Sequence, residues 1–492
     1  MNAFDIQSYL RRQSENIRRR IALFGGKLYL EFGGKLFDDF HASRVLPGFA
    51  PDTKIKMLME LKEDAEVIVV INADDIERNK RRGDLGITYD QDTLRLIDAF
   101  RDCGLYVPTV VITRYRGQKA AEQFRKKLEQ LELRVYLHYE IPGYPLDLEH
   151  ILSEEGFGRN DFVPTERSLI VVTAPGPGSG KMATCLSQVW HENRRGVKAG
   201  YAKFETFPIW DLPLRHPINL AYEAATADLS DVNMLDPYHL EAYGVKAVNY
   251  NRDVESFPVL NTMLKSIRGE SPYASPTDMG VNLIGQCIVD DVACCKAARQ
   301  EIIRRYYNAL CAKRQGMSDG KEAEKIHLLM TRCDLSVLER PVIAAAVGRA
   351  EREGLPAVAI ELADGTLVTG GTSELLGASS ACLVNALKTL AGIEKDVRLM
   401  SPEILAPIQK LKTEHMGNRN PRLHTDETLI ALTICAVTDE NAARALEQLH
   451  KLKDCQLHAS VILSRVDESV FQRLGLQMTF EPCYQSNRLY HG

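Results

Sequence analysis

Short apolar runs alternate with helix-like patterns along the first part of the chain. Runs with the length and β-branched content of strands are Leu28–Phe32, Glu66–Ile71, Val107–Thr113, Arg134–His138 and Leu169–Thr173. Strands that are apolar along their whole length are buried on both faces, which is typical of a parallel sheet covered by helices. The connection between two parallel strands through a helix is almost always right-handed. The pattern therefore predicts an α/β fold with a doubly wound, mostly parallel sheet.

Amphipathic helical patterns fill the gaps between these runs. They cover Thr53–Lys62, Thr93–Arg101 and Ala120–Leu131, and a further helix begins at Lys181. From about residue 204 to residue 291 the chain is polar, rich in proline and aromatic residues, and without a clear period. We interpret this region as irregular loops that carry function.

A second α/β pattern follows a basic helix that is predicted at Val292–Arg314. The segment "AVAIELADGTLVTGG" predicts a hairpin that turns at Asp364 and Gly365. Later helices and two strands, at His458–Leu463 and Gln477–Glu481, complete a smaller unit. We therefore expect a Rossmann-like or P-loop-like domain at residues 1–325 and a C-terminal α/β domain at residues 326–492.

The stretch "SLIVVTAPGPGSGKMAT" (168–184) contains the parts of a phosphate-binding loop. A strand leads into Gly176, Gly178 and Gly180, and Lys181 then opens a helix. Glycines let backbone N–H groups approach an anion, the helix N-terminus attracts negative charge, and lysine adds a mobile cation. The sequence thus favours binding of a phosphate-bearing ligand, such as a nucleotide, over a purely structural turn.

The spacing departs from the P-loop pattern G-x-x-x-x-G-K-[ST]. Pro175 stands where the first glycine belongs, and Met182 stands where a hydroxyl would bind Mg²⁺. The nearest hydroxyls are those of Ser179 and Thr184. Binding of the ligand is therefore favoured over metal-assisted hydrolysis, and Mg²⁺ stays open as a cofactor.

Other candidates follow the predicted strands, at the edge where open parallel sheets bind ligands. Gly33 and Gly34 follow the first strand and offer a second place for a phosphate group. Asp74 and Asp75 follow the next one. Their carboxylates can orient water or Mg²⁺, or they can simply cap the following helix.

Glu205 and His216 are further candidates for acid–base catalysis in the irregular region. A carboxyl or imidazole group must lie within hydrogen-bond reach of a substrate to transfer its proton, which spacing along the chain cannot show. Capping or solvated roles are the alternative for both. The catalytic residues thus stay unknown, with Asp74, Asp75, Glu205 and His216 as candidates.

Charge and cysteine content exclude several classes of protein. The formal net charge of 61 − 66 = −5 gives no basic field for nucleic acid or anionic lipid. No run approaches the roughly 18 apolar residues of a membrane span, so we expect a cytoplasmic protein. The 11 cysteines are scattered, and neither CxxC pairs nor HExxH is present, so the sequence predicts no metal site.

Several long phrases resemble one bacterial family. They include "GKLYLEFGGKLFDDFHASRVLPGF", "VVTAPGPGSGKMATCLSQ", "GYAKFETFPIWDLPLRHPINLAYEAATADL" and "GNRNPRLH". Over essentially the whole chain the sequence is similar to DUF1846, a domain of unknown function. The resemblance implies a cytosolic protein with an N-terminal α/β region, a separate C-terminal domain and assembly into homo-oligomers. It implies no substrate and no catalytic residue.

Three functions are consistent with these features. The first is an enzyme that binds a small phosphorylated or acidic ligand at residues 174–181. The second is a sensor that binds the ligand without turning it over. The third is a structural oligomer whose Gly-rich loop is only a tight turn. The reaction and the substrate stay unknown, and the sequence leaves open whether the protein is an enzyme.

Overall fold

The computed structural model describes residues 3–82, 85–229 and 231–485. It divides the chain into two compact units, Met1–Ala298 and Arg299–Gly492. The boundary predicted after residue 325 lies beyond this division. No helix among the described residues is both long and apolar enough to cross a lipid bilayer.

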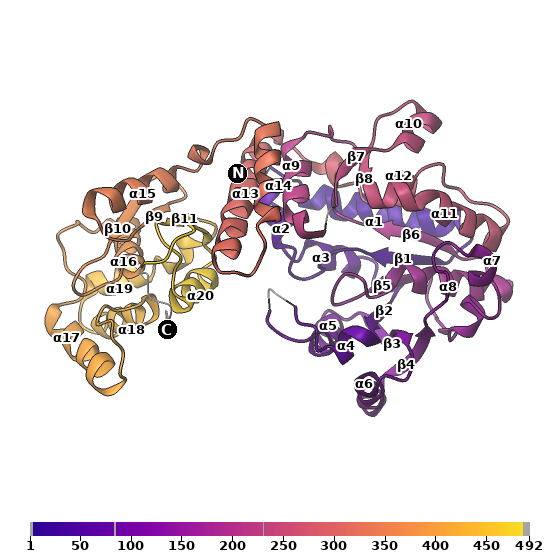
Figure 1. The fold of residues 1–492 in the computed structure, drawn as a ribbon, viewed down its shortest axis with the longest axis horizontal. Helices are drawn as coiled ribbons and strands as arrows, with labels where there is room; N and C mark the ends of the chain where they lie inside the picture. The colour runs from indigo at the N-terminus through magenta and orange to yellow at the C-terminus, as the bar shows by residue number, and fades with distance from the viewer. Residues whose placement is uncertain (1–2, 83–84, 230, 486–492) are drawn as a thin grey trace. The chain divides into compact units, whose positions relative to one another are not determined.

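The N-terminal unit is built on one sheet of six parallel strands in the order β4-β3-β2-β5-β1-β6 (Figure 1). The strands are β1 (Leu28–Phe32), β2 (Ala65–Asn72), β3 (Tyr106–Tyr115), β4 (Arg134–Tyr139), β5 (Leu169–Thr173) and β6 (Gly200–Phe204). Every residue of β1, β2 and β5 is buried, as their continuous apolar sequences predict. The doubly wound parallel sheet is confirmed.

The direction of the crossovers decides which face each helix covers. The chain moves from β2 to β3 to β4 in one direction along the sheet and from β5 to β6 in the other. Right-handed crossovers that run in opposite directions place their helices on opposite faces. Accordingly α4 (Ala73–Glu77), α5 (Tyr89–Asp102) and α6 (Lys119–Gln130) pack on β2, β3 and β4, whereas α8 (Lys181–Arg194) packs on β1, β5 and β6 (Figure 1).

The carboxyl ends of β2 and β5 are therefore adjacent but lead into connections on opposite faces. Such a switch point leaves a crevice at the edge of an open parallel sheet, which is where these folds bind ligands. The loop after β5 is the Gly-rich loop, residues 174–180; Asn72 ends β2, and Asp74 and Asp75 follow it in α4. The fold thus brings two of the predicted site segments to one place.

The interpretation of residues 204–291 as irregular loops is wrong for much of its length. The region forms α9 (Pro217–Ala225), α10 (Pro237–Tyr243), the 18-residue α11 (Asn251–Arg268), α12 (Pro276–Met279) and a hairpin of β7 (Asn233–Leu235) and β8 (Val248–Tyr250). Helix α11 contains Pro258 and many polar residues, which hide its period in the sequence. Strand β6, "GYAKF", was also missed, because it is short and carries Lys203 in place of an apolar residue.

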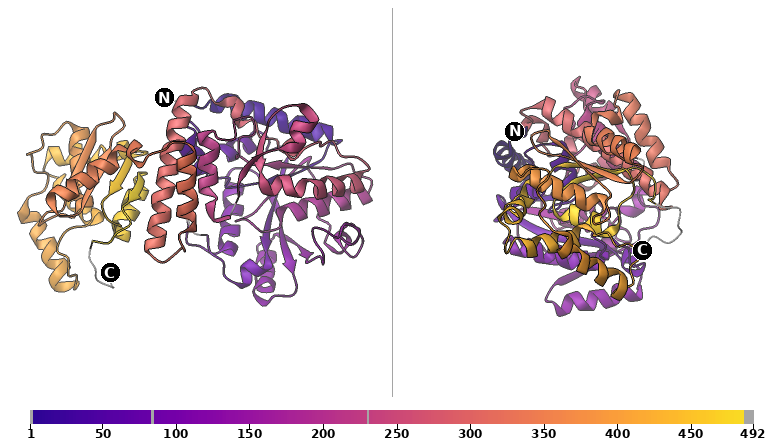
Figure 2. Two further views of the ribbon diagram at one scale, coloured as in Figure 1. Left: turned by 45° about the horizontal axis from the view of Figure 1, so that its top comes forward. Right: turned by 90° about the vertical axis from the view of Figure 1, so that its left-hand side faces the viewer.

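The C-terminal unit contains a four-stranded sheet in the order β10-β9-β11-β12, seen in orange and yellow in Figure 2. The predicted hairpin is confirmed as β9 (Ala357–Glu361) and β10 (Leu367–Gly371), and it turns at Asp364 and Gly365. Helices α15 (Pro341–Glu353) and α16 (Ala378–Ala391) pack on it. Strands β11 (Gln456–Ala459) and β12 (Gln477–Phe480) complete the sheet.

Gly370 marks the closest approach between this sheet and α16. A Cβ atom at Gly370 would lie 2.1 Å from the backbone nitrogen of Cys382, which cannot move without shifting the helix. We expect Gly370→Ala to lower the free energy of unfolding by about 1–3 kcal/mol, the usual cost of overpacking. Chemical denaturation of the full chain measures this change.

Gly348→Ala in α15 is the matched control for Gly370→Ala. Its added Cβ would come no closer than 3.6 Å, to the side chain of Arg352. Since alanine favours helix more than glycine does, we expect this variant to gain up to about 1 kcal/mol. Equal stabilities for the two variants would contradict the packing described here.

Candidate functional site

Two hydrogen bonds fix the Gly-rich loop to the neighbouring strands. Asn72, at the end of β2, donates from Nδ2 to the carbonyl of Gly178 at 3.3 Å. Thr113, near the end of β3, donates from Oγ1 to the carbonyl of Ser179 at 2.7 Å. Gly178 (φ 74°) and Gly180 (φ 90°) adopt left-handed conformations that other residues rarely adopt. The loop is thus held in one shape before any ligand arrives.

This arrangement leaves backbone N–H groups free. The C=O and N–H of a trans peptide point in opposite directions, so the N–H of Gly180 points away from Thr113. None of the described residues accepts a hydrogen bond from the amides of Gly178, Gly180 or Lys181. Free amides at the start of a 14-residue helix attract an anion.

Lys181 is the first residue of α8 and is partly buried. In the described part of the chain its ammonium group has no hydrogen-bond or ion-pair partner. Lys203, another partly buried basic group after a strand of this sheet, pairs with Asp253 at 2.7 Å. Lys181 is therefore an uncompensated positive charge beside free amides.

The two ends of the loop differ in how open they are. A Cβ atom at Gly176 would lie 2.3 Å from the hydroxyl oxygen of Tyr89, so this tyrosine packs directly against the glycine. A Cβ atom at Gly178 would meet nothing within 4 Å. Ser179 uses its hydroxyl within the loop, donating to the carbonyl of Gly176 at 2.9 Å. The hydroxyl of Thr184 is buried and has no described partner.

Gly33 and Gly34, the second predicted phosphate site, lie against other side chains. A Cβ atom at Gly33 would lie 2.7 Å from Cγ of Glu205. A Cβ atom at Gly34 would lie 3.3 Å from Nζ of Lys54, which is itself paired with Asp39 at 2.6 Å. The close approach of Glu205 accounts for glycine at position 33 without a ligand.

Asp74 and Asp75 follow β2 as predicted, in the first turn of α4. Asp74 accepts hydrogen bonds from Arg116 at 2.7 Å and Gln118 at 3.0 Å. Burial alone would raise the pKa of Asp74, but these two donors and the arginine charge hold that pKa below its ordinary value. Asp75 pairs with Lys80 at 3.3 Å. Both carboxylates thus already bind basic side chains, an arrangement that favours a structural role.

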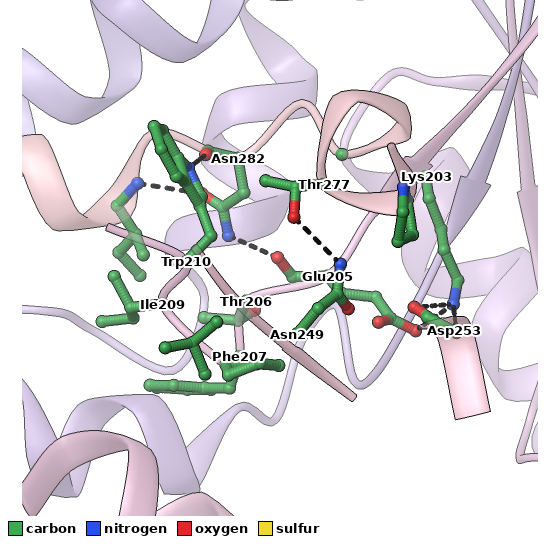
Figure 3. A pocket seen from close by; sticks show the side chains of 15 residues that line it. Lys203, Glu205, Thr206, Phe207, Ile209, Trp210, Asn249, Asp253, Thr277 and Asn282 are labelled. Atoms are coloured by element: carbon green, nitrogen blue, oxygen red, sulfur yellow. Dashed lines mark hydrogen bonds and ion pairs between the residues drawn. The ribbon is translucent and has the colours of Figure 1, made fainter. Parts of the chain in front are cut away.

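Glu205 belongs to a charged cluster after β6 (Figure 3). Lys203 contacts both oxygens of Asp253 at 2.7 Å and one oxygen of Glu205 at 3.1 Å. Burial, together with the nearby charges of Asp253 and Glu31, raises the pKa of Glu205 although Lys203 opposes the shift. Two partly buried carboxylates thus share one ammonium group, an arrangement consistent with the raised pKa of Glu205.

A small cavity lies beside this cluster. Its volume is about 50 Å³, which holds a few water molecules but not an organic ligand. Side chains that line it and are labelled in Figure 3 include Thr206, Trp210, Asn249, Thr277 and Asn282. The cavity that Glu205 lines is therefore of a size for water.

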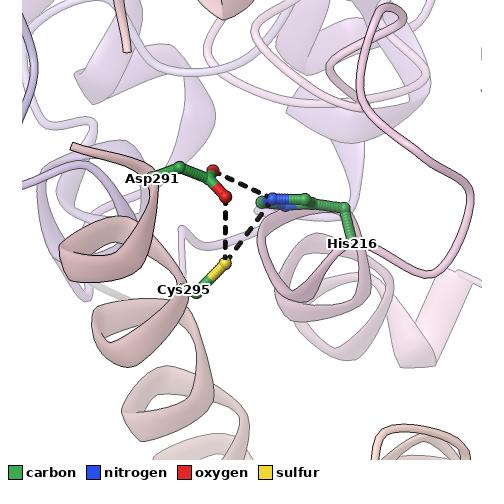
Figure 4. Close-up of side chains that lie close together, drawn as sticks. All are labelled: His216, Asp291 and Cys295. Carbon is green, nitrogen blue, oxygen red and sulfur yellow. Dashed lines mark hydrogen bonds and ion pairs between the residues drawn. The ribbon is translucent and has the colours of Figure 1, made fainter. Parts of the chain in front are cut away.

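His216 lies beside two residues far away in the sequence (Figure 4). Its Nε2 is 3.0 Å from Oδ1 of Asp291 and 3.5 Å from Sγ of Cys295. The ligand atoms of the three side chains lie within 4.8 Å of one another, as at a metal site. Nδ1, however, accepts a hydrogen bond from the backbone of Ile218 at 3.3 Å.

That hydrogen bond decides the tautomer of His216. A neutral ring whose Nδ1 accepts must carry its proton on Nε2, which then donates to Asp291. A metal ion would need the Nε2 lone pair, and so would place a proton on Nδ1 against the N–H of Ile218. Burial lowers the pKa of His216, which also favours the neutral ring. The hydrogen bonds of His216 therefore favour a helix cap over a metal centre.

A larger hollow at the carboxyl ends of β3 and β4 was not found from the sequence. We name it the tyrosine pocket, and its volume is about 730 Å³. Its lining includes Tyr115, Arg116, Tyr139, Glu140, Tyr144 and Arg159. Tyrosines at strand ends are a weak signal, because most pack into cores, and Arg159 comes from a different segment.

Comparison with known proteins assigns the chain to a family. The N-terminal DUF1846 domain of unknown function matches residues 2–334, and the C-terminal DUF1846 domain matches residues 338–490. The chain belongs to the DUF1846 family. The resemblance noted from the sequence is thereby confirmed.

Relatives of this DUF1846 protein align over nearly their whole length. The UPF0371 protein stu1377 of Streptococcus thermophilus is 56% identical over 488 residues, 99% of each chain. The UPF0371 protein CE2832 of Corynebacterium efficiens is 57% identical over the same length, again 99% of each chain. These names state no ligand, substrate or reaction.

The raised pKa of Glu205 makes the stability of the DUF1846 protein depend on pH. The folded state holds a proton on Glu205 at pH values where the unfolded chain has lost it. The free energy of unfolding therefore falls as pH rises from about 4.5 through the raised pKa. We expect Glu205→Gln to remove this part of the pH dependence.

Chemical denaturation at a series of pH values measures the effect. As pH rises, the unfolding free energy of Glu205→Gln should increase relative to that of the native protein. Asp75→Asn, at a carboxylate outside this cluster, serves as a control for general charge removal. A difference between Glu205→Gln and native protein that is constant with pH would contradict the assignment.

Proposed function

We propose that the N-terminal unit binds a phosphate-bearing ligand at the Gly-rich loop, residues 174–181. Lys181 carries the proposal, because its ammonium group opens α8 without a described partner. The amides of Gly178, Gly180 and Lys181 supply neutral donors to the same anion. Phosphate oxygens are the ligands that such a set of donors recognises best.

The position of the loop supports the same function. It follows a central strand at the switch point of a parallel sheet, where ligands of such folds bind. The side of the loop at Gly178 is open. Tyr89 covers only the opposite end, at Gly176.

A second Gly-Lys pair that opens a helix provides an internal comparison for Lys181. Gly320 is left-handed (φ 93°) and precedes Lys321, the first residue of α14 (Lys321–Arg332), just as Gly180 (φ 90°) precedes Lys181. Lys321, however, is 84% exposed and pairs with Asp319 at 2.8 Å. The local motif is the same, but only Lys181 follows a strand of the parallel sheet and lacks an acidic partner among the described residues.

Removal of the Lys181 charge should weaken binding of phosphate compounds. We expect Lys181→Ala to bind pyrophosphate or a nucleoside diphosphate about 10- to 100-fold more weakly than native protein does. This is the change in affinity that loss of one charge-assisted hydrogen bond usually causes. Isothermal titration calorimetry measures the affinities. Lys321→Ala removes a lysine from the equivalent local motif, and it should leave the affinities for pyrophosphate and nucleoside diphosphates unchanged.

The same titrations separate the three functions. Binding that depends on Lys181 supports a ligand site, and turnover of the bound compound then distinguishes an enzyme from a sensor. If native protein binds neither phosphate, pyrophosphate nor any common nucleotide, the loop is only a tight turn. Equal losses in Lys181→Ala and Lys321→Ala would also overturn the assignment of the site.

A further inference from the structure

We propose that the ligand is a nucleotide and that its base lies in the tyrosine pocket. This inference rests on the proposed function, since it takes the phosphate groups to lie at the Gly-rich loop. The pocket volume of about 730 Å³ falls in the range of small-molecule sites. A bare phosphate would leave nearly all of it empty.

Strand β3 connects the pocket to the loop. Thr113 of β3 binds the loop carbonyl of Ser179, and Tyr115, two residues later, lines the pocket. Neighbouring strands lie about 4.8 Å apart, so the ends of β5 and β3 are about 10 Å apart across β2. A nucleotide can extend over that distance, whereas a phosphate ion cannot.

Tyr144, which also lines the pocket, interacts electrostatically with a residue of α8, the helix that Lys181 opens. Tyr144 lies close enough to Glu31 and Cys185 that, after burial, their charges raise the pKa of its hydroxyl. Cys185 is four residues after Lys181, so the two side chains share one face of α8. The positive charge of Lys181 acts on Cys185 in turn. Tyr144 and Lys181 thus both interact electrostatically with Cys185.

The chemistry of the pocket suits a planar heterocycle. The guanidinium of Arg159 lies over the ring of Tyr139, 4.8 Å from its centroid, and Tyr115 meets Tyr139 edge-on with ring centroids 6.3 Å apart. Arg159 is exposed, so a base can extend this stack on the outer face of the guanidinium. Its N–H groups have no acceptor among the described residues and can donate to the base.

The other charged side chains at the pocket form ion pairs with one another. Arg116 is held by Glu140 at 3.0 Å and by Asp74 at 2.7 Å. Arg114, between Thr113 and Tyr115, adopts a left-handed conformation (φ 52°) at a bulge in β3 and also binds Glu140. Non-glycine residues in this conformation are concentrated at binding sites, where the surrounding structure holds them in place. This ion-pair network keeps the ends of β3 and β4 together around the pocket.

The test compares ligands with and without a base. Pyrophosphate, ribose 5-phosphate and the diphosphates of adenosine, guanosine, cytidine and uridine are titrated into the full-length protein by calorimetry. We expect at least one nucleoside diphosphate to bind about tenfold or more tightly than pyrophosphate, as stacking of one base on an aromatic side chain predicts. Lys181→Ala should weaken all the ligands that bind.

In Tyr139→Ala the nucleoside diphosphate should bind no more tightly than pyrophosphate, and the affinity for pyrophosphate should be unchanged. Tyr139→Phe keeps the aromatic ring, so it should still bind the nucleotide more tightly than pyrophosphate. Arg159→Ala, at an exposed position, provides a second variant if Tyr139→Ala fails to fold. Lys181-dependent pyrophosphate binding without tighter nucleotide binding would overturn this inference and leave the proposed function standing. The inference would also be overturned if Tyr139→Ala and Arg159→Ala both still bound the nucleotide more tightly than pyrophosphate. If no ligand binds, both proposals fail.

Discussion

The hydrogen bonds from Asn72 and Thr113 to the carbonyls of Gly178 and Ser179 are the constraint on which the site depends. They turn the negative ends of two peptide dipoles toward the sheet. The positive ends then face the other way, at the start of α8, where no described residue satisfies them.

The order of the strands makes those anchors available. Asn72 and Gly178 are 106 residues apart in sequence, yet β2 and β5 are neighbours because the chain crosses back from β4 before β5 is laid down. All six strands are parallel, so their carboxyl ends share one edge. The edge at which we propose ligand binding is thus a consequence of topology, and its chemistry comes from the residues that follow each strand.

Electrostatic compensation distinguishes Lys181 from its surroundings. Asp74 is neutralised by Arg116, and Lys54 by Asp39. Lys203 faces both Asp253 and Glu205, and the pKa of Glu205 is raised by burial and by the nearby charge of Asp253. These pairs stabilise the edge but leave nothing free to bind an anion. An unpaired cation is costly to bury, so Lys181 keeps its place only half buried, where water or an anionic ligand can solvate it.

The sequence alone determined the class of fold, five of the six parallel strands and the Gly-rich loop, because continuous apolar runs and glycine spacing are local signals. It did not reveal α11, where Pro258 and polar residues interrupt the helical pattern, or β6, where Lys203 interrupts a short apolar run. It could not show that His216 would meet Asp291, 75 residues away. Nor could it show that, of two lysines that each follow a glycine and open a helix, Lys321 would pair with an aspartate while Lys181 has no acidic partner among the described residues. Only the tertiary structure decided those points, because the partners of a charged side chain are brought together by strand order and helix packing rather than by proximity along the chain.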